Sequence, residues 1–301
     1  MRTQVTAIAA AAAVIVALTA VDGWAQSGAR ALSHTPWGHP DLQGIWNNST
    51  TTPLEQLTDE ERAQDRAARR PVIEATRGTG AAWPEQKGRL EQPSLIVDPP
   101  DGRMSMTMQA VQRLIDRENA RAGRGESDSW LDRNSWERCL TRTLPVAMIP
   151  NLYNANYQIL QTPDHVVLVM EMIHEARIIP LDGGPHASDR IRQWLGDSRG
   201  HWEGDTLVIE SSHFNDRSAW EGSSRDLKVL ERFTRVSDDR IHYEFTVEDP
   251  ATWDQPWSAE IPMMATEGPM YEYACHEGNH DIRHIQEVYR NIELQEAPET
   301  R

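Results

Sequence analysis

Short segments in which apolar and polar residues alternate follow one another from Tyr157 to Cys275, and turn-forming Pro, Gly or Asp residues separate them. Segments of this length, rich in β-branched and aromatic residues, are typical of β-strands. Glu203-Gly204-Asp205 and Asp238-Asp239 stand where short hairpin turns belong, so consecutive strands are expected to be antiparallel neighbours. The pattern predicts a mainly β fold, either an antiparallel up-and-down barrel or a strongly curved sheet, with a β-sandwich as the alternative.

The first half of the chain has fewer strand-like segments and two helix patterns. Thr58 and Glu61 have the spacing of a capping box, and Pro71 would end the helix that they begin. A second helix is predicted from about residue 107 to 122, with an apolar stripe expected to lie in the core, formed by Met108, Val111, Leu114 and Ile115. Residues 26–150 are therefore predicted to be an irregular, partly helical region packed outside the sheet. Residues 151–301 would form the sheet and a C-terminal helix, within one structural domain.

Residues 1–25 are predicted to be a signal peptide. Arg2 supplies the positive start, residues 7–21 form a short apolar run, and Gly23-Trp24-Ala25 places small residues at the expected cleavage site. An uncleaved anchor is the alternative. No later segment has the roughly 18 consecutive apolar residues that a membrane span needs. We therefore expect a periplasmic or secreted protein with no stable membrane span.

A formal net charge of −16 makes nucleic acid an unfavourable partner, because the chain repels phosphate backbones. Small molecules or cations are the better partners. The two cysteines, Cys139 and Cys275, are expected to form a disulfide in an oxidising compartment, with two separate buried thiols as the alternative.

The segment from Val166 to Ile179 is predicted to be a single strand that is apolar on both faces, so its ionisable residues should be at least partly buried. In this hypothesis His174 transfers a proton, Glu171 or Glu231 orients it, and Arg177 stabilises developing negative charge. A structural histidine and cross-strand ion pairs on a wet face are the alternative interpretation.

Further side chains are candidates for contact with a ligand inside the barrel. Aromatic side chains grip apolar ligands, and ionisable groups could reach across the sheet, although core packing explains the aromatic residues equally well. These candidates are Trp46, Tyr157, His213, Glu244, Trp253 and Tyr273.

His276-Glu277-Gly278-Asn279-His280 matches the HExxH pattern of zinc hydrolases, in which one helix carries both histidines. Gly278 and Asn279 are poor helix formers, and the preceding residues alternate like a strand. The apolar positions beyond them instead predict a helix that begins after Asn279 as its N-cap, through Ile282, Ile285, Val288, Tyr289 and Ile292. A zinc hydrolase is therefore the second alternative, and His276 remains a catalytic candidate in another role.

Phosphate-binding and dinucleotide-binding glycine motifs are absent from the sequence. A Gly-x-Ser-x-Gly nucleophile elbow is not expected, and Asp197-Ser198-Arg199-Gly200 is interpreted as a turn, with a catalytic role as the alternative. We therefore expect an enzyme without a nucleotide or redox cofactor, with a bound metal ion as the alternative. The favoured function is binding of a largely apolar small molecule and its conversion by acid/base chemistry, as a lyase, isomerase, cyclase or hydrolase. A non-catalytic periplasmic carrier of a hydrophobic ligand is the rival prediction.

Two resemblances add to this interpretation. Gly44-Ile45-Trp46 resembles the Gly-x-Trp signature that opens the first strand of lipocalins and other calycins. A set of segments that spans most of the chain resembles a large family of exported bacterial proteins of undefined function; among them are PDLQGIW, RQWLGDSRGHWEGDTLVIE and YEYACHEGN. The second resemblance implies export and a shared fold and names no reaction. It also implies that the position of His280 is often Tyr.

Overall fold

A computed structural model describes residues 32–64, 67, 88–125, 127–151, 153–218, 220 and 222–296. The predicted signal peptide, residues 1–25, and Pro71 lie outside the described residues. The described residues from Ser33 onward belong to one compact unit.

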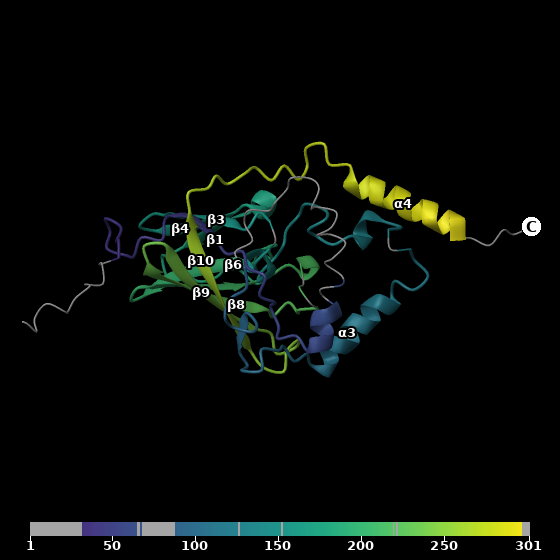
Figure 1. Cartoon of the computed structure of the whole chain (residues 1–301), viewed down its shortest axis with the longest axis horizontal. Coiled ribbons are helices and arrows are strands. Elements are labelled where there is room, and N and C mark those ends of the chain that lie inside the picture. The colour runs from purple at the N-terminus through teal and green to yellow at the C-terminus, as the bar shows by residue number, and fades with distance from the viewer. Residues whose placement is uncertain are drawn as a thin grey trace, which may run out of the picture. The chain divides into compact units, whose positions relative to one another are not determined.

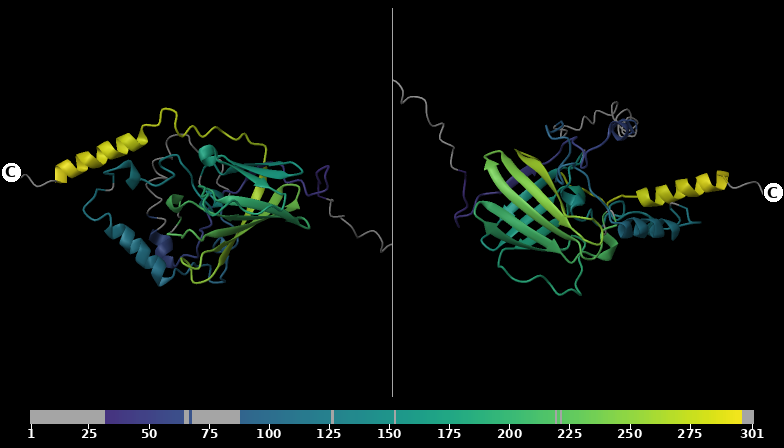
Figure 2. Two further views of the ribbon diagram at one scale, coloured as in Figure 1. Left: turned by 180° about the vertical axis from the view of Figure 1, so that it is seen from behind. Right: turned by 90° about the horizontal axis from the view of Figure 1, so that it is seen from below.

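Ten strands form one antiparallel sheet that curves strongly (Figure 1 and Figure 2). Their order is β5-β4-β3-β1-β10-β9-β8-β7-β6, and β2 pairs with β10 beside this path. The strands are β1 (Gly44–Asn47), β2 (Ile96–Asp98), β3 (Asn156–Gln161), β4 (His165–Met170), β5 (Ala176–Pro180), β6 (Asp197–Glu203), β7 (Thr206–Ser212), β8 (Lys228–Ser237), β9 (Arg240–Glu248) and β10 (Trp257–Thr266). The predicted mainly β, hairpin-connected fold is confirmed.

Strand β1 joins two meanders that are far apart in the sequence. The first runs through β3, β4 and β5, and the second runs from β6 to β10. Trp46 of β1 stands opposite Tyr157 of β3 and opposite Ala265 of β10. The residues after Gly44 therefore do form a strand, and that strand lies in the middle of the sheet order.

The sheet is not closed into a barrel. Strands β5 and β6 stand at the two ends of the strand order, and within the described residues neither pairs with the other. They nevertheless pack together: a Cβ atom on Gly200 of β6 would lie 2.9 Å from Cγ2 of Ile179 in β5. Of the two predicted forms, the strongly curved sheet is the one that the structure has. We call the unpaired boundary between β5 and β6 the seam.

The concave face of the sheet carries the core. Alternate residues of each strand are buried there, and Phe233, Tyr243 and Phe245 form a run of packed aromatic rings. Aliphatic side chains from the other strands complete this cluster, which includes Leu168, Ile209 and Ile261. Residues on the convex face of β8, β9 and β10 are mostly polar, as expected for a sheet with one face toward water.

The prediction of one strand from Val166 to Ile179 is wrong. Strand β4 ends at Met170, a 3₁₀ turn follows at Met172–His174, and β5 begins at Ala176. Ile173 and His174 have positive φ angles of 62° and 47°, which reverse the chain although neither residue is a glycine. The apolar Met and Ile of this turn continue the hydrophobic run, so no Gly, Pro or Asn marks the turn in the sequence.

The predicted helix near residue 107 is confirmed as α3 (Met108–Asn119), and the Thr107 hydroxyl accepts a hydrogen bond from the Ala110 amide as its N-cap. The prediction that its apolar stripe lies in the core is wrong for Met108, which is 82% exposed, and for Ile115, which is 47% exposed. At the earlier helix, Thr58 and Glu61 form the predicted capping box through reciprocal hydrogen bonds to each other's backbone amides.

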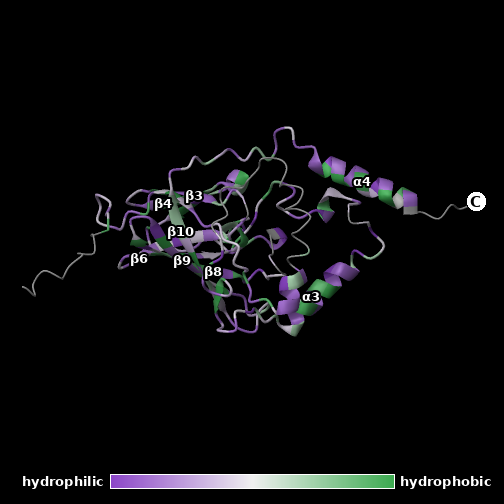
Figure 3. Cartoon of the chain, in the orientation of Figure 1, coloured by the Kyte–Doolittle hydropathy of each residue, from purple (hydrophilic) through white to green (hydrophobic). Residues whose placement is uncertain are grey.

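The C-terminal helix is α4 (Asp281–Glu296), and the Asn279 side chain accepts a hydrogen bond from the amide of Asp281. Figure 3 shows apolar and polar residues interspersed on α3 and α4. The short 3₁₀ helices are η1 (Trp130–Asp132), η2 (Val146–Met148), η3 (Met172–His174) and η4 (Asp216–Ser218).

The predicted disulfide between Cys139 and Cys275 is present. It ties the segment after β10 to the loop before β3. Among the residues that the structure describes, no helix combines the length and apolar character needed to cross a lipid bilayer.

Candidate functional site

Arg177 of β5 and Glu231 of β8 form a buried ion pair in the concave face of the sheet. The guanidinium donates from Nη1 to Oε1 of Glu231 at 2.9 Å, and Nη2 donates to Oε2. Arg177 is only 4% exposed and Glu231 is completely buried. Each of these buried charges stabilises the other, because removing either side chain would leave the other charge buried without a counter-charge.

Hydroxyl groups from three neighbouring strands complete the polar network. Nη2 of Arg177 also donates to the hydroxyls of Ser198 and Ser211, at 3.2 and 3.0 Å, and the Tyr243 hydroxyl donates to Glu231 at 3.0 Å. Burial, and next the Glu231 charge, raise the pKa of Tyr243 well above its ordinary value, so the phenol stays protonated. Burial opposes the charge of Arg177, but the Glu231 carboxylate raises the pKa of Arg177 above its ordinary value.

One donor of Arg177 has no partner: Nε is buried and makes no hydrogen bond within the described residues. Buried polar groups in folded proteins nearly always have a hydrogen-bond partner, so an unpaired N–H at this position is unusual, although Nε is itself closed to solvent.

A pocket of about 550 Å³ lies at the seam, and Arg177 and Ser198 both line it. We call it the seam pocket. Strand β5 supplies one wall, and residues 192–198, which lead into β6, supply the other. Trp194 and Leu195 give this second wall an apolar part, and the Thr143 hydroxyl fixes it by donating to the Trp194 carbonyl at 3.2 Å. The unpaired strand edges thus leave a space beside the strand that carries Arg177.

Glu175 and Asp197 are the acidic residues that line the seam pocket, and Glu175 is the one on the same strand edge as Arg177. Glu175 and Arg177 stand two positions apart in extended backbone, so their side chains lie on the same face. One carboxylate oxygen of Glu175 accepts a hydrogen bond from the Arg142 amide at 3.1 Å. Burial raises the pKa of Glu175 above its ordinary value of 4.5. Hydrogen bonds and nearby cations favour the charged carboxylate and lower the pKa, but the effect of burial is larger. Glu175 therefore has the properties of a proton-transfer group.

Cationic and aromatic groups surround the outer side of Glu175. Arg142 lies with its guanidinium carbon 5.1 Å from the ring centre of Trp136, and burial lowers the pKa of Arg142 from its ordinary value. His174 is exposed, and its Nδ1 makes a 2.8 Å hydrogen bond with the backbone carbonyl of Tyr273. The predicted candidates His174 and Tyr273 are thus in contact with each other, next to the seam pocket and not among its lining residues.

Glu171 has a different set of partners. Its carboxylate accepts hydrogen bonds from the Asn156 side chain at 2.9 Å and from the Tyr271 amide at 2.9 Å, and Asn156 in turn accepts one from Asn47. These contacts hold the segment after β10 against the sheet. Glu171, His174 and Arg177 were predicted as one group, but the turn after Met170 gives each of them separate neighbours.

Three of the predicted ligand-binding aromatic residues are packed in the core. Trp46 donates from Nε1 to the Leu42 carbonyl at 2.9 Å. Tyr157 donates to the Ala147 carbonyl at 3.0 Å, and burial raises its pKa to about 12. Trp253 packs edge-on against Trp257, with ring centres 6.0 Å apart. The core-packing interpretation therefore describes these three contacts.

Glu244 lies on the convex face of β9, opposite Arg232 in β8 and Glu260 in β10. It is partly exposed and faces away from the seam pocket. The neighbouring Arg232 pairs with Glu203 at 2.9 Å, so this face carries the cross-strand ion pairs that formed the alternative interpretation.

His213 belongs to a second cluster, on the convex face of β6 and β7. Its Nε2 contacts Asp189 at 2.7 Å, and its Nδ1 contacts the Ser212 hydroxyl at 2.8 Å. The ring of His186 lies 5.5 Å away and bridges Asp197 and Glu210, at 2.8 and 3.1 Å. All ring nitrogens of both histidines are thus engaged. Because Asp189 and His186 belong to the connection between β5 and β6, the cluster fastens that connection, which forms a wall of the seam pocket.

The HExxH residues do not share a helix. His276 and Glu277 lie in an exposed turn after Cys275, and α4 begins only at Asp281. The rings of His280 and His284 come within 6.1 Å of each other. Among the described residues, no group of three or more His, Cys, Asp or Glu side chains has the geometry of a metal site.

Glu175 was missed in the sequence and Ser198 was assigned to a turn, although both had a signal. Glu175 precedes Arg177 by two positions, which is the spacing of one strand face. Gly196-Asp197-Ser198-Arg199-Gly200 fits the pattern Gly-x-Ser-x-Gly of a nucleophile elbow. The structure places Ser198 within β6, with its hydroxyl 2.8 Å from that of Ser211, and not at the strand-to-helix turn that such an elbow requires.

No model of a known protein family matches this chain, and no curated protein matches it. The functional argument therefore depends on the geometry of the site.

Proposed function

We propose that this protein binds a small molecule in the seam pocket and converts it by acid/base chemistry in which its own side chains move the proton. The observation that supports this proposal is that Glu175 and the buried, partly unpaired Arg177 line the same pocket. A carboxyl group with a raised pKa and a fixed cation are the two elements that proton transfer next to a carbonyl needs.

In the proposed reaction, the Glu175 carboxylate accepts a proton from a carbon next to a carbonyl group of the ligand. The electron pair left on that carbon moves onto the carbonyl oxygen, and the positive charge of the nearby Arg177 stabilises the resulting oxyanion. Return of the proton to another atom gives an isomerisation, whereas loss of a neighbouring leaving group gives an elimination. Glu231 acts as a positioning residue, because its two hydrogen bonds fix the guanidinium.

The ligand that suits this pocket has an apolar body and one oxygen acceptor. Trp194 and Leu195 offer the apolar contacts, and Arg177 with Ser198 offers the polar end. We further propose that the protein works outside the cytoplasm, since the Cys139–Cys275 disulfide is typical of oxidising compartments and residues 1–25 have the pattern of an export signal.

The test is native mass spectrometry of the full protein purified from its source cells, which detects any bound small molecule. The recovered ligand is then incubated with wild type, with Glu175→Gln and with Glu248→Gln, an exposed carboxylate at the end of β9 that serves as the matched control. The proposal expects product with wild type and Glu248→Gln, and a loss of roughly 100-fold or more in rate with Glu175→Gln.

Retention of the ligand without product in wild type would support the carrier function instead. Equal turnover by wild type and Glu175→Gln would rule out the proposed role of Glu175.

A further inference from the structure

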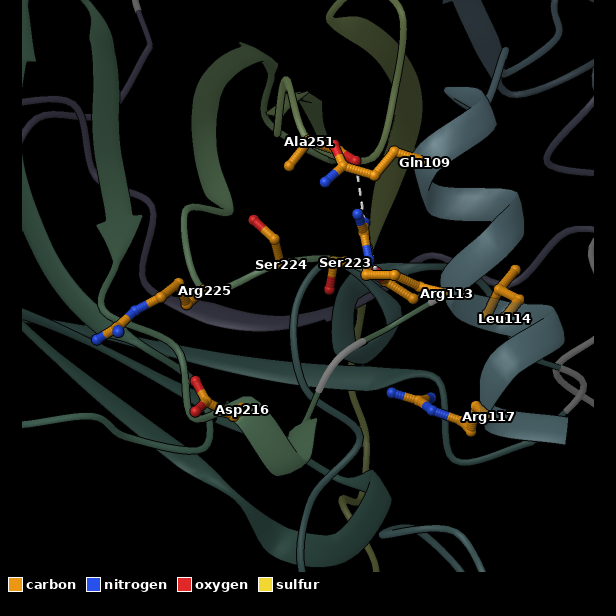
Figure 4. A pocket seen from close by; sticks show the side chains of 10 residues that line it. Gln109, Arg113, Leu114, Arg117, Asp216, Ser223, Ser224, Arg225 and Ala251 are labelled. Atoms are coloured by element: carbon orange, nitrogen blue, oxygen red, sulfur yellow. Dashed lines mark hydrogen bonds between the residues drawn. The ribbon is translucent and has the colours of Figure 1, made fainter. Parts of the chain in front are cut away.

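A second pocket, about 420 Å³ in volume, lies between α3 and the loops that precede β8 and β10, away from the seam pocket (Figure 4). We call it the arginine pocket. Three arginines and one aspartate are its charged lining residues: Arg113, Arg117, Arg225 and Asp216. This positive excess contrasts with the net charge of −16 of the whole chain.

Arg113 is held in place by neutral acceptors. Its Nη2 donates to the backbone carbonyls of Gly222 and Ala251, at 3.3 and 3.0 Å, and to the Thr252 hydroxyl at 3.0 Å. These contacts fix the guanidinium and leave its charge without a carboxylate in direct contact within the described residues. The nearest acidic link is indirect, since the Thr252 hydroxyl donates to Asp249 at 2.7 Å.

The Asp249 carboxylate is already saturated. It accepts hydrogen bonds from the Ser224 hydroxyl at 2.8 Å, from the Ala251 amide at 3.2 Å, and from the Ser224 amide and the Thr252 hydroxyl. Asp249 therefore organises the two loops that face α3, and it does not extend into the pocket as a counter-ion for Arg113.

Arg117 follows Arg113 by one helical turn on the same face of α3, and Figure 4 shows its side chain directed across the pocket toward Asp216. Two like charges at this spacing destabilise a helix by about 0.2–0.5 kcal/mol. Arg117 is exposed and lies in the last turn, where a cation is favoured by the helix dipole, whereas Arg113 lies in the middle of the helix. Arg225 lies on the other side of the pocket, with its guanidinium directed away from Arg113.

Close packing between α3 and one loop sets the width of the arginine pocket. Gly222 has a φ angle of +74°, and a Cβ atom there would lie 2.9 Å from Cδ2 of Leu114. This contact brings the loop against α3 and places the carbonyl of Gly222 within reach of Arg113. The pocket is thus formed before any ligand binds.

We propose that the arginine pocket binds a compact oxyanion, either a carboxylate or a phosphate group on a small molecule. Guanidinium groups are suited to these groups because their N–H donors match two oxygen atoms of one anion. Arg113 is the pre-oriented donor, and Arg117 supplies the second guanidinium. The proposal is independent of the seam pocket, since the two pockets share no lining residue.

Isothermal titration calorimetry of the full protein at low ionic strength tests this, with inorganic phosphate and succinate as probes and sodium chloride at matched ionic strength as the blank. The variants are Arg117→Ala, Arg117→Lys and, as the matched control, Arg121→Ala, a partly exposed arginine four residues beyond Arg117 that does not line the pocket. Arg117→Ala should weaken binding of the better probe roughly tenfold or more, which corresponds to loss of one charge-assisted hydrogen bond.

Arg117→Lys should retain part of the affinity, and Arg121→Ala should leave it within about twofold. Preference for succinate would identify a carboxylate ligand, and preference for phosphate would identify a phosphorylated one. The proposal is overturned if neither probe gives saturable heat above the chloride blank, or if Arg117→Ala and Arg121→Ala weaken binding equally.

Discussion

The guanidinium of Arg177 and the carboxylate of Glu231 meet in a region where neither side chain reaches solvent, although β5 and β8 are not neighbours in the sheet. The pair reaches across the concave face of the sheet. It therefore connects the strand on one side of the seam with the middle of the second meander. Ser198 and Ser211 bring β6 and β7 into the same network.

Replacing Arg177 by Met should lower the free energy of unfolding by about 3–5 kcal/mol, because it leaves Glu231 buried without a counter-charge. The double variant Arg177→Met/Glu231→Gln should be more stable than Arg177→Met alone, since the uncompensated charge is gone. Urea unfolding monitored by tryptophan fluorescence measures both. Glu231→Gln is the second single variant. A loss of stability in the double variant equal to the sum of the two single losses would contradict a direct pairing of these residues.

Glu175 should make stability depend on pH. Its pKa in the folded state lies above the ordinary value of 4.5, so the folded protein holds a proton that the unfolded chain has already released. The free energy of unfolding should therefore fall as the pH rises from about 4.5 through the raised pKa, and this part of the fall should be absent in Glu175→Gln. Urea unfolding at a series of pH values tests this, with Glu248→Gln as the control that keeps the wild-type slope.

The packing of β6 against β5 can be tested at Gly200. A Cβ atom at this position would approach Ile179 and Leu181 to 2.9 and 2.8 Å, so Gly200→Ala should destabilise the protein by about 1–3 kcal/mol. Ile178→Ala in β5 removes a side chain that is 67% exposed and should change stability by less than about 0.5 kcal/mol. Equal effects of the two substitutions in thermal unfolding would mean that the seam is open at Gly200.

Removing the disulfide by Cys139→Ser/Cys275→Ser should lower the stability substantially. The bridge closes a loop with a sequence separation of 136 residues, and the chain-entropy treatment gives about 4–5 kcal/mol for loops of this size. Adding a reductant to wild type should reproduce most of the loss and should have no further effect on the double variant. If the reductant lowered the stability of wild type and of the double variant equally, the loss in wild type would not be due to reduction of the disulfide.

The hairpin pattern of β6 to β10 could be predicted because turn residues and alternation agree there, for instance at Gly204, which has a φ angle of 59°. The turn between β4 and β5 could not, because Ile173 adopts a left-handed conformation that its side chain disfavours. Surrounding packing imposes this conformation, and a local pattern does not contain that information. The sequence interpretation grouped Glu171, His174 and Arg177 on one strand, and the unpredicted turn gives each of them separate neighbours.

The site was predicted in part. Arg177 was expected to be at least partly buried, and Arg177 and Glu231 were both candidate catalytic residues. The structure pairs them, whereas the partner hydroxyls of Ser198 and Ser211 come from strands whose distance from β5 depends on the curvature of the whole sheet. The partner of Glu171 could not be predicted, because the amide of Tyr271 lies in a segment without a periodic pattern of apolar and polar residues.

Strand β1 has only four residues, yet it pairs with β3 on one side and with β10 on the other. During synthesis these residues leave the ribosome early, and their second partner follows only near the far end of the chain. The hydrogen bonds between β1 and β10 must therefore form late. Pairing of segments that are distant in sequence is associated with slow folding. Until β10 is available, one edge of β1 remains unpaired, and an unpaired strand edge makes an incomplete chain prone to aggregation.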